Sequence, residues 1–238
     1  MIEPGGLAAP IETAGSPEPP ALRRSRWGIF SGGLFFTVAF FLPFVEGCVP
    51  RGYVEDLITN AGTNHVFHSL DSSFNFFSHL GAFLFPYLHG FCIALCALLA
   101  WRARTTVLTN VLLALACVSV ALDSIAQFQW YCDIDMNIIV AQFTLTPHNM
   151  GPLFMLGWLI VGLQILTVKN AKDGRAKILW AATTALLPNF VWHAHFAGRG
   201  DTTLAIGWFL GVAATLLYLL CAIFGLRALR KHTERTQT

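Results

Sequence analysis

The chain has 238 residues, of which 55% are hydrophobic and only 12% are charged. Water-soluble domains carry roughly 25% charged residues, so this composition excludes an ordinary soluble domain and favours a membrane protein. The net charge of +2 comes without a basic groove interleaved with aromatic residues, which argues against nucleic acid as a partner.

Residues 1–26 are predicted to form a disordered cytoplasmic tail, because they are rich in proline, lack apolar periodicity and end in a basic group. An apolar run from 27 to 45 then predicts the first transmembrane helix. This run is longer than the apolar core of a usual signal peptide, which favours an uncleaved anchor. The alternative is a lipoprotein signal that ends at Cys48.

Five further apolar segments predict five more transmembrane helices, each close to the ~20 residues that cross a bilayer core. They cover residues 82–101, 106–126, 150–168, 178–197 and 203–225. The bundle therefore occupies residues 27–226, with outer loops at 46–81 and 127–149 and a basic cytoplasmic tail at 227–238. Proline at position 188 is expected to kink the fifth helix.

Basic residues are sorted to one side of this predicted bundle. When the sides alternate along the chain, every Lys and Arg except Arg51 and Arg199 falls on the side that holds both termini. The positive-inside rule places that side in the cytoplasm. The sequence thus predicts an all-α, polytopic integral membrane protein with six transmembrane helices and cytoplasmic N and C termini, located in a cell membrane such as the bacterial inner membrane.

Ionisable residues within the predicted spans lie toward the outer side. His89 falls about 10 Å deep in the second span and His193 about 6 Å deep in the fifth, while Asp123 lies in the third. Two histidines at one level would suit haem b, and the two together with Asp123 would suit Zn²⁺. A proton or substrate pathway is a third interpretation. The favoured interpretation is that these residues occupy the wet interfacial zone, with no cofactor.

Cysteines and glycines suggest two structural features. Cys48 and Cys132 fall in the two outer loops, where an oxidising compartment would permit a disulfide between them. Gly207 and Gly211 form a GxxxG pattern in the sixth span, which favours close helix packing within the bundle and leaves dimerisation open.

The chain contains no P-loop, GxSxG, HExxH or Rossmann glycine pattern. The expected function is therefore that of a non-catalytic scaffold or subunit, whose partners are the lipid bilayer and a homo-oligomer or membrane complex. Two alternatives stay open. One is a metal- or haem-binding enzyme that uses the outer histidines, and the other is a transporter of protons or small molecules.

Overall fold

The structure, a computed structural model, describes residues 18–46, 49–63, 70–132, 151–198 and 203–237. Within these ranges the chain is helical and contains no β-strand, apart from an isolated antiparallel bridge between Val45 and Leu204. The prediction of an all-α fold is confirmed for this part of the chain.

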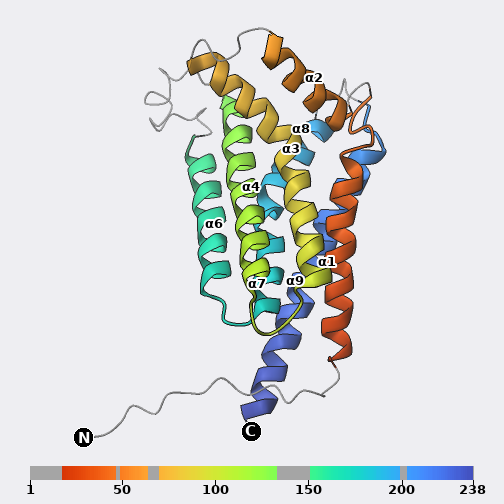
Figure 1. Cartoon of the computed structure of the whole chain (residues 1–238), viewed down its shortest axis with the longest axis vertical. Coiled ribbons are helices and arrows are strands. Elements are labelled where there is room, and N and C mark those ends of the chain that lie inside the picture. Colours follow the sequence, from red (N-terminus) through yellow and green to blue (C-terminus); the bar gives the residue numbers. More distant parts are fainter. Residues whose placement is uncertain (1–17, 47–48, 64–69, 133–150, 199–202, 238) are drawn as a thin grey trace, which may run out of the picture.

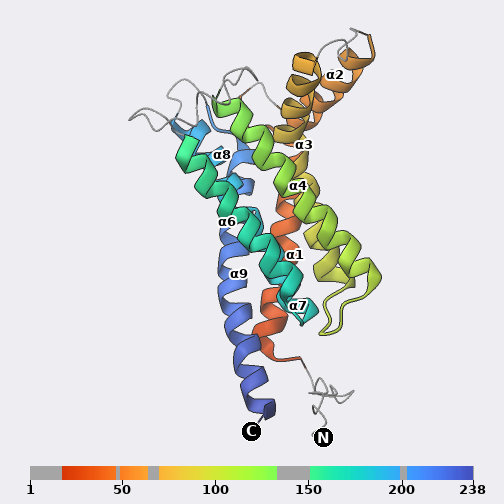
Figure 2. The same cartoon turned by 90° about the vertical axis from the view of Figure 1, so that its left-hand side faces the viewer.

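Most helices of the described residues run side by side, and α2 lies at an end of the bundle (Figure 1). Helices α7 and α8 stack end to end and together form one column, while α2 lies beside the start of α3 in both views (Figures 1 and 2). The elements are α1 (Pro20–Ala39), α2 (Pro50–Thr63), α3 (Leu70–Leu99), α4 (Val107–Cys132), α6 (Gly151–Asn170), α7 (Gly174–Thr184), α8 (Leu186–Gly198) and α9 (Ile206–Gln237).

The first helix ends at Ala39, earlier than the apolar run predicts. Pro43 explains this end, because a proline ring clashes with the carbonyl four residues before it in a helix. The chain beyond turns toward α9 and forms backbone hydrogen bonds with the segment that precedes this helix. The amide of Glu46 donates to the carbonyl of Thr203 at 2.9 Å, and the amide of Ala205 donates to the carbonyl of Phe44 at 3.1 Å.

The predicted outer loop at 46–81 is largely helical, since α2 and the first turns of α3 lie within it. Helix α2 is anchored by Val54, which is buried with Phe44 and Trp192 in a cluster separate from the main core. A helix satisfies its own backbone hydrogen bonds. This polar segment can therefore be helical when an apolar side chain packs it against the bundle.

The fifth predicted span is interrupted for one residue, Ala185, whose backbone stays in the right-handed helical region (φ −80°, ψ −8°), at the place where the sequence predicts a kink. Helix α7 ends at Thr184, α8 begins at Leu186, and Pro188 lies in the first turn of α8. Proline has no amide hydrogen to donate to the carbonyl of Thr184, and its ring displaces that carbonyl. The break therefore falls about one turn before the proline.

Helices α1 and α9 are antiparallel neighbours, and glycines permit their close approach. A Cβ atom at Gly32 would lie 2.8 Å from the ring of Tyr218, and a Cβ at Gly28 would meet the sulfur of Cys221. The buried core includes Leu22 near the start of α1 and Leu229 near the end of α9. The start of α1 and the end of α9 therefore lie at the same end of the bundle (Figure 1).

Two helices in the described part of the chain are long and apolar enough to cross a membrane. They are Val107–Ile125, with a mean hydropathy of 1.9, and Ile206–Arg235, with a mean hydropathy of 2.3. Two shorter apolar helices, Leu84–Leu99 and Leu156–Asn170, lie beside them. These helices are consistent with a membrane location.

Candidate functional site: the polar core of the bundle

Polar side chains are buried around the break between α7 and α8. The exposed fraction is 0% for His89, 2% for Asp123 and Asn189, and 7% for His193. Thr183 and Thr184, the last residues of α7, are buried with them. The polar residues that the sequence singles out therefore line the interior of the bundle.

Side chains from three helices cover the carbonyl groups at the end of α7. The imidazole of His89 on α3 bonds the carbonyl of Ala181 through Nε2 at 3.1 Å, and Thr184 Oγ1 donates to the same carbonyl at 2.7 Å. Gln164 on α6 donates from Nε2 to the carbonyl of Thr183 at 3.2 Å. Because a carbonyl only accepts, His89 must carry its hydrogen on Nε2. These bonds tie α3 and α6 to the broken helix.

His193, on α8, is also held by hydrogen bonds that involve backbone carbonyl groups. Its Nδ1 donates to the carbonyl of Asn189 at 2.6 Å, and Trp208 on α9 donates from Nε1 to the carbonyl of His193 at 3.2 Å. The rings of Phe44 and Trp208 flank the imidazole, with centroids 5.5 and 5.6 Å away. The ring is thus fixed, with Nε2 against Gly211.

The two histidines lie at different levels of α9. The ring of His89 packs edge-on against Tyr218, with centroids 6.0 Å apart, whereas His193 contacts Gly211. Tyr218 follows Gly211 by seven residues, a rise of about 10 Å along a helix. The two imidazoles therefore contact α9 at residues seven positions apart, and a haem or zinc ion held by the pair stays a prediction.

Asp123 is buried in α4 and completes the predicted set of metal ligands. Among the described residues, no group of three or more His, Cys, Asp or Glu side chains is arranged to hold a metal ion. A metal site formed by His89, Asp123 and His193 therefore stays a prediction.

A small cavity lies beside His193, between α1, α3, α8 and α9. Its lining includes Phe44, Tyr87, Trp192 and Gly211, and its volume is about 10 Å³. This volume has room for one water-sized molecule, whereas sites for organic ligands occupy roughly 300–1,000 Å³. The cavity as it stands does not admit an organic substrate.

Glycine packing at the start of α9 is intramolecular. A Cβ at Gly207 would lie 2.7 Å from the carbonyl oxygen of Pro43, and a Cβ at Gly211 would meet His193. Both glycines are thus occupied by contacts within the chain. Of the predicted disulfide partners, Cys48 lies outside the described residues and Cys132 is the last residue of α4, so that pairing stays a prediction.

Sequence reasoning missed several members of this core, namely Gln164, Thr183, Thr184, Tyr218 and Trp208. The burial of Gln164 could have been predicted from the sequence, because an amide side chain in the middle of an apolar run rarely faces lipid. No family model, curated protein or solved structure matches this chain.

Proposed function

We propose that the chain is an integral membrane protein with six membrane-spanning units, namely α1, α3, α4, α6, the α7–α8 column and α9. The supporting observation is that large apolar side chains are exposed along the columns, while several polar side chains are buried within the apolar core. His89, Thr109 and Thr184 have no exposed surface, while 68% of Phe190 and 59% of Leu159 are exposed. Water disfavours this arrangement and a hydrocarbon solvent favours it. Further exposed residues extend along the columns: Leu34, Val38, Leu115, Val118, Leu122, Leu163, Leu166, Leu216 and Leu220.

We place both ends of the chain in the cytoplasm, and the gathering of basic turns supports this orientation. The amide of Gly174, between α6 and α7, donates to the carbonyl of Ala103, between α3 and α4, at 2.8 Å. Arg26 on α1 donates to the carbonyls of Ala97 and Leu98 at the end of α3. The four basic segments therefore meet at one end of the bundle, which the positive-inside rule assigns to the cytoplasm.

The role that we propose is that of a non-catalytic scaffold or subunit of a membrane complex. The polar side chains of the core serve as connections between helices, as His89, Gln164 and Trp208 illustrate. Such interhelical hydrogen bonds stabilise a bundle without performing chemistry.

One observation favours a transporter as a second candidate. A helix broken inside a membrane bundle is typical of transporters, where the ends of the two half-helices face an ion or substrate. Four buried polar atoms of the core lack a hydrogen-bond partner within the described part of the chain: His89 Nδ1, Gln164 Oε1, His193 Nε2 and Tyr218 Oη. Such atoms are costly unless a ligand or water engages them.

Reporter fusions test the topology. Alkaline phosphatase fused to the C-terminus should be inactive, because this enzyme does not fold in the cytoplasm. A fluorescent protein fused there should be fluorescent, because it does fold in the cytoplasm. Carbonate extraction should leave the chain in the membrane fraction. An exterior C-terminus, or a chain released by carbonate, would contradict the proposed topology.

Single cysteines in a background without native cysteines separate the two roles. For a scaffold, cysteines at Thr184 and Asn189 should resist a water-soluble maleimide, while a cysteine at Thr233 should react in permeabilised cells. Labelling at Thr184 or Asn189 would instead indicate an aqueous path and favour the transporter. Elemental analysis and an absorption spectrum of the purified protein test zinc and haem independently, and either cofactor at one equivalent would favour the enzyme alternative.

A further inference from the structure

The end of the bundle that carries the basic segments holds a large excess of positive charge. Among the described residues, its only carboxylates are those of Glu18, Asp173 and Glu234. Thirteen Lys and Arg residues surround them: Arg23, Arg24, Arg26, Arg102, Arg104, Lys169, Lys172, Arg175, Lys177, Arg227, Arg230, Lys231 and Arg235.

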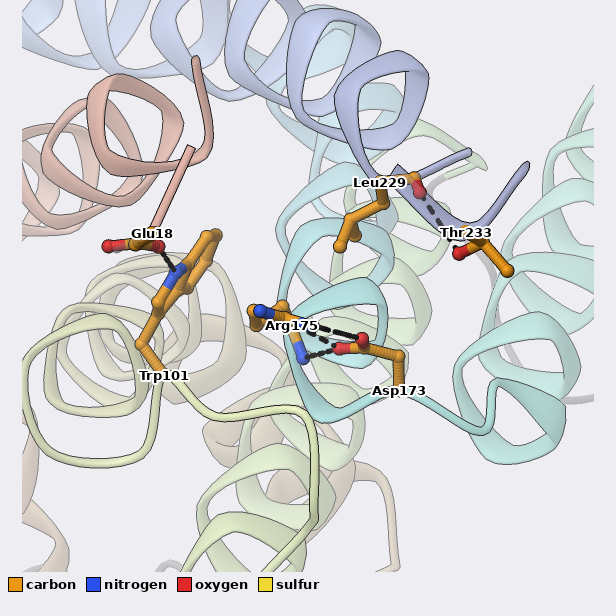
Figure 3. Close-up of polar contacts among 6 residues, drawn as sticks. All are labelled: Glu18, Trp101, Asp173, Arg175, Leu229 and Thr233. Carbon is orange, nitrogen blue, oxygen red and sulfur yellow. Dashed lines mark hydrogen bonds and ion pairs between the residues drawn. The ribbon is translucent and has the colours of Figure 1, made fainter. Parts of the chain in front are cut away.

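Each of these carboxylates already has a partner within the chain. Asp173 forms an ion pair with Arg175 at 2.8 Å, and Glu234 forms one with Arg230 at 2.9 Å. Glu18 accepts a hydrogen bond from the indole of Trp101 (Figure 3). The acidic groups at this end therefore leave most of the positive charge without internal compensation.

Part of this excess lies where α1 starts and α9 ends. Ser25 on α1 lies against Gly225 on α9, since a Cβ at Gly225 would be 3.1 Å from the Cβ of Ser25. The neighbouring cations Arg23, Arg24, Arg227 and Lys231 are exposed. Helix α9 continues beyond the other columns at this end, so its cations extend outward from the bundle (Figures 1 and 2).

We propose that this paired end of α1 and α9 binds the phosphate-bearing headgroups of anionic phospholipids in the cytoplasmic leaflet. The inference rests on the proposed membrane topology, which places these cations at headgroup depth. Arginine and lysine beside a membrane helix attract anionic lipids, each cation adding to the attraction. Arginine also bonds phosphate oxygens in a bidentate manner, which favours phosphate over a diffuse counterion. Lipid headgroups are the occupant that a membrane itself supplies at this position.

Lipid retention by the full chain tests the proposal. The protein is reconstituted in nanodiscs that contain equal amounts of phosphatidylcholine and phosphatidylglycerol, released in mild detergent and weighed with its retained lipids by native mass spectrometry. The variant Arg24→Gln/Arg227→Gln removes two cations from the proposed site. The control Arg51→Gln/Arg199→Gln removes the two cations that the predicted topology assigns to the opposite side.

The wild type and the control should retain more phosphatidylglycerol than phosphatidylcholine. In the site variant, the ratio of retained phosphatidylglycerol to phosphatidylcholine should fall by a factor of about three or more. Added sodium chloride should reduce the preference in the wild type, whereas inorganic phosphate at equal ionic strength should have no additional effect. Equal retention of the two lipids by the wild type, or equal losses in both variants, would overturn the proposal. Displacement by inorganic phosphate would indicate a site for the free ion instead.

Failure of the topology has a different signature. A chain that does not enter nanodiscs of phosphatidylcholine alone contradicts the membrane proposal and, with it, the lipid site. A chain that enters them and shows no lipid preference contradicts the lipid site alone. A thermal midpoint of the site variant within the range of the control shows that a lost preference is not a loss of folding.

Discussion

The buried side chain of His89 links two helices, because its Nε2 on α3 donates a hydrogen bond to the carbonyl of Ala181 on α7. We predict that His89→Leu inserts normally, because leucine fills a similar volume and Thr184 still donates to that carbonyl. An interhelical hydrogen bond in a membrane is worth about 0.6 kcal/mol on average, so the thermal midpoint in detergent should fall only slightly. The thermal midpoint of the variant His89→Gln, which retains a hydrogen-bond donor, should fall less. Loss of insertion in His89→Leu would make the residue essential for folding.

The contact between Gly211 and His193 predicts a larger effect. A Cβ at Gly211 would collide with an imidazole that is fixed by the carbonyl of Asn189, so Gly211→Ala should destabilise the bundle by about 1–3 kcal/mol. Gly162→Ala is the matched control, because a Cβ there meets nothing within 4 Å and alanine favours a helix. Thermal unfolding in detergent compares the two variants.

A double variant locates the cause of that effect. If the collision with the imidazole is responsible, adding His193→Ala to Gly211→Ala should cost less than the two single changes together. Equal midpoints for Gly211→Ala and Gly162→Ala would contradict the contact itself.

Helix α4 has an exposed apolar face, and a substitution there tests whether this face contacts lipid or water. Val118 lies midway along the candidate span Val107–Ile125 and is 55% exposed. On a membrane-spanning helix, Val118→Lys should oppose insertion by about 2.5–3.5 kcal/mol, whereas on a helix in water it would be nearly neutral. The fraction of inserted chains, read from protease protection of membrane vesicles, measures the cost.

Val107→Lys is the control for this prediction. Val107 begins the same helix, is more exposed and follows the basic turn that holds Arg102 and Arg104. A lysine there should reach the headgroups at little cost. Equal insertion of both lysine variants would contradict the assignment of α4 as a membrane-spanning helix.

For the whole molecule, the predicted pairing of Cys48 with Cys132 would link the two outer segments. We expect a disulfide between their peptides in mass spectra of the unreduced protein, and we expect its loss to lower stability by about 2–4 kcal/mol. Cys48→Ser should leave the thiol of Cys132 reactive toward an impermeant maleimide on the outer face. Labelling of Cys132 in the unreduced wild type would contradict the pairing.

Much of the helical plan is predictable from the sequence because it depends on local properties. Five of the predicted apolar segments correspond to α1, α3, α4, α6 and α9, and the sixth corresponds to the column of α7 and α8. The burial of His89, Asp123 and His193 differs from the favoured interpretation, which placed them in the wet interfacial zone. It agrees with the general tendency of an ionisable residue in an apolar run to avoid the outer surface of a bundle.

The sequence by itself determined that this chain forms long apolar helices with its cations gathered at one end, because hydrophobic length and charge are read along a single segment. Only the tertiary structure decided that the two histidines contact α9 at different residues and that the chain after Pro43 pairs with the segment before α9. These features depend on which helix faces meet and in which register. That register is set by contacts between distant residues, such as Gly32 with Tyr218 and Gly211 with His193, for which no local pattern carries a signal.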